Sequence, residues 1–163
     1  MFYFFSLILF SFSLTFNLIC DTEYNIESNG KVDVVTEHLY SKSHYFRNFK
    51  IIGTFEDNLG NYGSNDTSVS AEYKNGEVIN LQWSSKLIYQ NNKMIYAKGV
   101  RKKGVDDAGV GKAILFSGEN PLNVLNDVNC NYAVKFFKDN AFAKWICYLP
   151  KNSINILQKL EQK

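Results

Sequence analysis

The side chains best suited to covalent chemistry are three cysteines, two of which form an isolated pair. Cys20 ends an uncharged apolar segment, whereas Cys130 and Cys147 stand apart in the second half of the chain. An isolated pair of cysteines in an exported protein is a candidate disulfide. We therefore predict a bond between Cys130 and Cys147. The alternative is two buried thiols that pack as small hydrophobic groups.

The two histidines do not indicate a catalytic or metal site. His38 and His44 are six residues apart, and Glu37 is the one other metal ligand that this region supplies. A Ser-His-Asp or Cys-His arrangement would have to use one of these histidines, and no nucleophile is apparent beside them. We predict no catalytic residue, no metal and no cofactor.

Two segments have the composition of ligand-binding loops but lack their spacing. Val110 rather than Lys follows Gly109, and Ala113 rather than Ser or Thr follows Lys112, so the phosphate-binding pattern is not met. Residues 57–67 are rich in Asn, Gly and Asp but lack the spacing of a calcium loop. We interpret both segments as connections between strands.

Aromatic side chains are the remaining candidates for a binding site. The chain contains 13 Phe and 10 Tyr, and aromatic residues make up 15% of it. Five of these side chains have polar tips and could line a barrel lumen that holds a small hydrophobic or amphipathic ligand: Tyr73, Trp83, Tyr96, Tyr132 and Trp145. Simple core packing is the alternative.

The polarity pattern that would position these side chains is typical of antiparallel strands. Apolar and polar residues alternate with period two, and Asn75-Gly76 between two such runs indicates a hairpin. We expect eight strands, near residues 32–40, 49–56, 68–74, 79–84, 94–101, 112–116, 130–137 and 141–149. Their short spacing predicts an all-β domain, either one antiparallel barrel of about eight strands or a β-sandwich.

The two late cysteines also suggest the register of the last hairpin. If they lie opposite each other, the turn is centred between Lys138 and Asp139, and Tyr132 pairs with Trp145. Opposed residues have Cα atoms about 4.5–5.5 Å apart, within the range that a disulfide accepts. The same register gives a uniformly apolar face, with the further pairs Val134–Ala143 and Phe136–Ala141.

A short helix is expected after Pro150. Asn152 or Ser153 can cap it. Its apolar stripe would cover an open barrel end or a sheet edge: Ile154, Ile156, Leu157 and Leu160.

The first twenty residues resemble an export signal. They are uncharged and largely apolar, and a polar stretch begins at Asp21. We therefore expect a signal peptide at 1–20 and a single secreted or periplasmic barrel domain at 21–163. The alternatives are an uncleaved membrane anchor and a lipid-modified Cys20, so a membrane would be contacted only through this segment.

The charge balance excludes one class of partner. The chain has 18 Lys and Arg against 16 Asp and Glu, a net charge of +2. Nucleic-acid binding depends on concentrated positive charge, so we predict no nucleic-acid partner. The oligomeric state is not predicted.

One part of the chain resembles a known family. The run from Gly109 through Gly111 to Gly118, then residues 122–127 and a strand beginning at Cys130, is similar to the late strands of the allene oxide cyclase-like, calycin-type barrels. The resemblance implies an eight-stranded antiparallel barrel with a hydrophobic cavity. No position matches a catalytic motif of the plant cyclases, so no activity is carried over.

Three functional hypotheses follow. The first is an exported barrel that binds a small hydrophobic or amphipathic ligand without catalysis. The second is a cell-surface or periplasmic structural or protein-interaction module with an outer apolar patch: Phe137, Phe142, Ile146 and Tyr148. The third is an isomerase or cyclase that acts in the lumen, for which the sequence identifies no reacting group.

Overall fold

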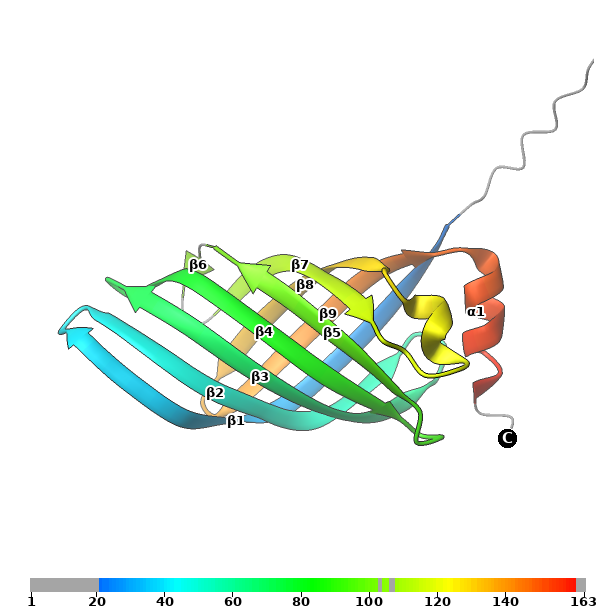
Figure 1. The fold of residues 1–163 in the computed structure, drawn as a ribbon, viewed down its shortest axis with the longest axis horizontal. Helices are drawn as coiled ribbons and strands as arrows, with labels where there is room; N and C mark the ends of the chain where they lie inside the picture. The colour runs from blue at the N-terminus through cyan, green and yellow to red at the C-terminus, as the bar shows by residue number, and fades with distance from the viewer. Residues whose placement is uncertain (1–20, 103, 106–107, 161–163) are drawn as a thin grey trace, which may run out of the picture.

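The chain folds into one closed antiparallel barrel (Figure 1). The computed structural model describes residues 21–102, 104–105 and 108–160, so the expected export segment at 1–20 lies outside the described residues. Eight strands form the wall: β1 Thr22–Ser41, β2 His44–Asp57, β3 Tyr62–Lys74, β4 Glu77–Tyr89, β5 Met94–Arg101, β7 Ala108–Phe116, β8 Asn129–Phe137 and β9 Asn140–Leu149. A two-residue strand, β6 Gly104–Val105, pairs with β4.

The strands follow one another around the barrel in chain order. Each wall strand pairs with the next one, and β9 pairs back with β1 to close the sheet. This meander confirms the predicted barrel of about eight strands and excludes the sandwich. Closure satisfies the backbone donors and acceptors that an open sheet would leave at its two edges.

The register of the last hairpin is the predicted one. Cys130 lies opposite Cys147, with a Cα–Cα distance of 4.3 Å, and the two are joined by a disulfide. Tyr132 pairs with Trp145, and β8 and β9 are connected by the turn at Lys138. One face of this hairpin is therefore buried in the lumen, as its apolar pattern predicted.

One end of the barrel is closed by two short helices (Figure 1). They are the 3-10 helix η1 Leu122–Leu125 and the helix α1 Lys151–Leu157. Leu125 and Leu157 are fully buried, so α1 covers the barrel end as its apolar stripe predicted. The predicted cap is wrong: Pro150 occupies the N-cap position, and Ser153 is buried inside the first turns.

A buried polar network lies beside this closed end. The Tyr24 hydroxyl donates to Asp57 Oδ2 at 2.7 Å and lies 2.9 Å from the Tyr89 hydroxyl. Asn61 donates to the same carboxylate from its backbone N and from Nδ2, both at 2.9 Å. Because every partner is buried and bonded, Asp57 holds the β2–β3 turn against the core at little desolvation cost.

The opposite end is open and asymmetric. Pairing of β1 with β9 stops at Lys31, so residues 33–41 of β1 pair only with β2 and extend beyond the barrel. This extension confirms the predicted strand at 32–40. Its free edge is interrupted by two bulges, after Val34 and after Leu39. Bulges of this kind hinder pairing with another strand.

Two segments that were predicted as connections are strands instead. β3 begins at Tyr62, inside the predicted loop 57–67, because its polar residues are paired on both sides by β2 and β4. β7 begins at Ala108, inside the predicted glycine-rich connection. The glycines of β7 make room for large lumen side chains, as described below.

Candidate functional site

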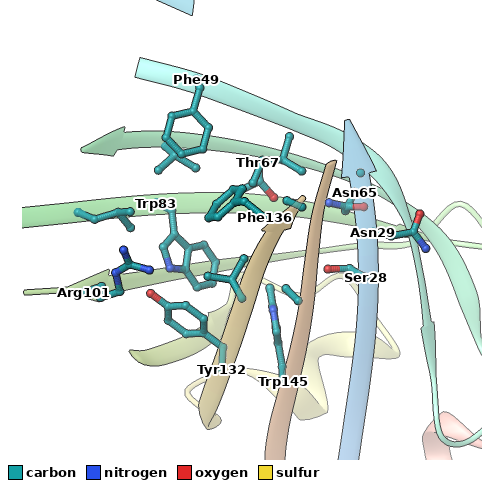
Figure 2. Close-up of a pocket in the computed structure, with 17 residues that line it drawn as sticks. Ser28, Asn29, Phe49, Asn65, Thr67, Trp83, Arg101, Tyr132, Phe136 and Trp145 are labelled. Atoms are coloured by element: carbon teal, nitrogen blue, oxygen red, sulfur yellow. The ribbon is translucent and has the colours of Figure 1, made fainter. Parts of the chain in front are cut away.

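The lumen contains a small cavity in its open half. The cavity has a volume of about 60 Å³, and seven of the wall strands contribute to its lining. Its wall is mostly apolar, with a few polar groups. Figure 2 labels ten of its residues: Ser28, Asn29, Phe49, Asn65, Thr67, Trp83, Arg101, Tyr132, Phe136 and Trp145.

The cavity exists because one part of the wall carries small side chains. Ser28 pairs with Ala143 and Gly30 with Ala141 on the adjacent strands β1 and β9, and all four line the cavity. An eight-stranded barrel has an interior just wide enough for side chains of ordinary size to fill it. A patch of Gly, Ala and Ser therefore leaves a hollow at this level.

Three aromatic rings form the floor of the hollow. The Trp83 ring lies 5.2 Å from Tyr132, edge to face, and 5.3 Å from Trp145, measured between ring centroids. Two of these rings pack against a glycine directly across the strand pair: Gly99 opposes Trp83 and Gly111 opposes Tyr132. A Cβ at Gly99 would lie 2.5 Å from the indole, so glycine is required there.

Several polar atoms of the lining are buried. Asn65 Oδ1 makes no hydrogen bond to any described residue. Trp83 Nε1 and Tyr132 Oη lie beside each other, and their one described hydrogen-bonding contact is this mutual one. Burial raises the pKa of Tyr132, although the neighbouring Trp83 indole and the Arg101 guanidinium oppose the shift. The hydroxyl therefore stays protonated at neutral pH and can donate to an acceptor in the cavity.

Arg101 brings a positive charge to the same wall. It ends β5, is 3% exposed and lies near the Tyr132 hydroxyl (Figure 2). A Cβ at Gly109 would overlap the Arg101 side chain, which explains a second glycine in β7. The cavity thus has a mostly apolar body with a polar side made of Trp83, Tyr132 and Arg101, and Ser28, Asn65 and Thr67 add polar groups elsewhere in its lining.

A second pocket forms the mouth of the lumen. It measures about 260 Å³ and shares Phe49 and Phe136 with the inner cavity. The two phenyl rings meet edge to face with centroids 6.1 Å apart, so they separate the two spaces. Arg47 lines the mouth, where its guanidinium is ion-paired with Glu37 at 2.7 Å. This ion pair raises the pKa of Arg47 even though partial burial opposes it.

The predicted ligand-binding residues divide into three groups. Trp83, Tyr132 and Trp145 line the inner cavity together. Tyr73 lines the mouth, where its ring stacks on Tyr45 with centroids 4.7 Å apart. Tyr96 was predicted to line the lumen, and this is wrong. Its side chain points out of the barrel and is 38% exposed, because its neighbours Ile95 and Ala97 face the lumen from β5.

No family model, curated protein or solved structure matches this chain.

Sequence reasoning missed the polar residues of the lumen, Arg101 and Asn65 among them. Arg101 shares the parity of Ile95, Ala97 and Gly99, which face the lumen, but neither face of β5 is clearly apolar in the sequence and the charge of Arg101 argued against burial. Asn65 was assigned to a loop, and only the pairing of β3 with both neighbours turns it inward. A search for apolar faces does not detect polar residues that face a lumen.

The described lining of the cavity offers apolar contacts and hydrogen-bonding groups. Among the described residues that line it, none is Asp, Glu, His or Cys. Across the described part of the chain, no group of three or more such side chains could hold a metal ion. The described helices include none that is long and apolar enough to cross a membrane.

Proposed function

We propose that this chain is an exported barrel that binds a small amphipathic molecule in its lumen without transforming it. The observation that supports this most strongly is the pair of buried donors at the cavity, where the Trp83 Nε1–H contacts the Tyr132 hydroxyl and the hydroxyl proton has no acceptor among the described residues. An unpartnered buried polar group costs about 1–3 kcal/mol. A ligand that offers an acceptor to both groups recovers this cost.

The character of the ligand follows from the rest of the wall. Val134, Ala143 and Trp145 offer apolar contact, and Arg101 adds a positive charge beside the two donors. A flat ring or short chain that ends in a carboxylate or carbonyl matches this distribution. Without an Asp, Glu or His in the described lining, proton transfer to or from such a ligand has no evident base.

Entry requires a small movement of the phenyl pair. A cavity of about 60 Å³ holds a few water molecules at about 10–15 Å³ each, whereas ligand pockets usually measure about 300–1,000 Å³. Phe136 is only partly buried. Rotation of its ring joins the cavity to the mouth, and the combined space reaches the lower end of that range.

Export is supported by the disulfide. A bond between Cys130 and Cys147 is compatible with an extracellular or periplasmic location. Together with the signal-like residues 1–20, it supports secretion, or retention in the periplasm, as the finer part of the proposal. The resemblance to allene oxide cyclase-like barrels stays a prediction.

Intrinsic fluorescence tests the proposal, because both tryptophans of the chain line the cavity. Benzoate provides a ring and an acceptor, and toluene provides the ring alone. We expect a saturable change of tryptophan emission with benzoate and a weaker response to toluene. Tyr132→Phe should weaken benzoate binding and leave the toluene response as it is.

A matched pair of substitutions locates the binding. Ala143→Leu fills the cavity and should abolish the response to benzoate, whereas Ala133→Leu makes the same change on the outer face and should not. The proposal fails if benzoate produces no saturable change, or if the Ala143→Leu protein responds as the unmodified protein does.

A further inference from the structure

The outer wall of the barrel is electrostatically divided. Strands β5, β7, β8 and β9 contain no Asp or Glu, and their outward positions carry the four lysines Lys98, Lys112, Lys135 and Lys144. The acidic residues of the wall lie on the other four strands, β1 to β4. We call the outward side of β5, β7, β8 and β9 the cationic face.

The lysines of this face have few carboxylate partners in the described part of the chain. Lys98, Lys112 and Lys135 form no ion pair with a described residue, although Lys112 donates to Asn131 Oδ1 at 2.6 Å. Among the described residues, Lys144, at the border with β1, is the one lysine of this face with a carboxylate partner, Glu27 at 2.9 Å. The face therefore attracts a negatively charged partner at low and moderate salt.

The same face exposes apolar side chains. Five of its large hydrophobic residues are half exposed or more: Val100, Val110, Phe137, Phe142 and Tyr148. Single exposed hydrophobic residues are ordinary, but a group on one wall, rimmed by charge, is typical of an interaction surface. Phe137, Phe142, Ile146 and Tyr148 are the outer patch expected from the sequence.

A shallow groove crosses the middle of the cationic face. Gly111 and Ala133 line it where β7 meets β8, with Val110 and Ile146 providing apolar contacts. Lys112 and Lys144 also line the groove. A hollow with apolar lining between two ammonium groups fits a protruding apolar side chain that is flanked by carboxylates.

We propose that the cationic face binds an acidic polypeptide segment that places an apolar side chain in this groove. The lysines favour a partner with negative charge, and the groove favours a partner with a protruding apolar side chain. A lipid surface is flat and is met best by protruding side chains, whereas a groove is filled by a side chain from an extended segment. The groove lies on the outer wall and shares Tyr132 with the lining of the lumen cavity, but binding there does not require the proposed lumen ligand.

The direct test is fluorescence anisotropy with a labelled synthetic peptide in which Glu and Leu alternate. We expect the full barrel to bind this peptide, added salt to weaken the binding, and a peptide with Gln in place of Glu to bind poorly. The double variant Lys112→Glu/Lys135→Glu should lose about tenfold or more in affinity, since each reversed charge turns an attraction into a repulsion. Val110→Asp should weaken binding through the groove itself.

Controls separate this site from the fold and from the lumen. Lys31→Glu/Lys50→Glu makes the same charge change on β1 and β2 and should leave the affinity for the peptide unchanged. The response to benzoate should survive in all these variants, because none of the substituted residues lines the lumen cavity. No binding of the Glu–Leu peptide, equal binding by both double variants, or binding only to phosphatidylglycerol vesicles would overturn the proposal.

Discussion

Two of the largest lumen side chains, Trp83 and Tyr132, are each accommodated by a glycine on the neighbouring strand. The glycines sit directly opposite the rings, at Gly99 and Gly111, and the rings cover them. A glycine in a strand weakens the local sheet, but an aromatic cross-strand partner compensates by shielding its backbone. The position of the aromatic cluster thus depends on residues that have no side chain.

Gly99→Ala should therefore disturb the cluster. The new Cβ would lie 2.5 Å from the Trp83 ring and 2.6 Å from the Lys112 carbonyl oxygen. Overpacking of this kind typically costs about 1–3 kcal/mol, and we expect that loss in the free energy of unfolding measured with urea. Gly76→Ala is the comparison. Its new Cβ would meet no atom within 4 Å, but the residue has a φ of +78°, so any loss of stability there comes from backbone strain and not from a steric clash. Unchanged tryptophan emission in the Gly99→Ala protein would contradict the packing described.

Tyr24→Phe tests the polar network at the closed end. It removes a donor to the buried Asp57 carboxylate, and we expect a loss of about 1–3 kcal/mol in unfolding free energy. Tyr148→Phe, at an exposed position, should change little.

The same network predicts a dependence on alkaline pH. Burial raises the pKa of Tyr24 and of Tyr89 above the ordinary tyrosine value of about 10. The folded state therefore retains protons that the unfolded state loses, and stability falls as the pH rises above about 10. Unfolding curves at increasing pH should show this fall, and it should be smaller in the Tyr24→Phe protein. An equal fall in both proteins would show that the network does not cause it.

For single residues, the sequence correctly predicted the orientation of side chains that follow the alternation of apolar and polar positions. Tyr132 and Trp145 face inward as their shared register requires. Tyr96 was misplaced because Met94, Tyr96 and the opposing small residues give β5 no clearly apolar face. Arg101 could not be recognised because a buried charge is an exception that only the three-dimensional contacts explain.

Among the elements, the β8–β9 hairpin is the one whose register was predictable from the sequence. A two-residue turn, a pair of cysteines and an apolar face all specify the same pairing. Because these local signals agree, the register of the hairpin can be predicted from the sequence. The starts of β3 and β7 were not predictable, because polar and glycine-rich residues are recruited into strands by neighbours on both sides.

The double substitution Cys130→Ala/Cys147→Ala should destabilise the barrel. The disulfide closes a loop over a sequence separation of 17 residues. The chain-entropy account assigns such a loop about 3 kcal/mol. Chemical unfolding of the variant and of the reduced native protein should show matching losses. If neither change lowers the midpoint of unfolding, the bond does not contribute to stability.

For the whole molecule, the two ends of the lumen differ in how they are filled. Leucines from α1 and η1 occupy the closed end, whereas small residues leave the open half hollow. The sequence predicted the covering helix and the number of strands. It could not predict the hollow, because that depends on which small residues meet at the same level of the barrel.

Leu157→Ala should loosen the closed end without affecting the cavity. Leu157 is fully buried, and truncation of a buried leucine costs about 2–5 kcal/mol. Gln158→Ala, at the exposed next position, should have little effect. Urea unfolding measures the loss, and an unchanged response to benzoate in the folded variant would show that the two ends act independently. Equal stability of both variants would mean that α1 does not close the barrel in solution.

The lumen-binding account is tested most directly by a crystal structure of the protein soaked with para-bromobenzoate. The anomalous signal of bromine locates the ligand without ambiguity. We expect the bromine between Phe49 and Phe136, and the carboxylate within hydrogen-bond distance of Trp83 Nε1 and Tyr132 Oη. A lumen that excludes the compound, with bromine found only on the outer wall, would contradict the account.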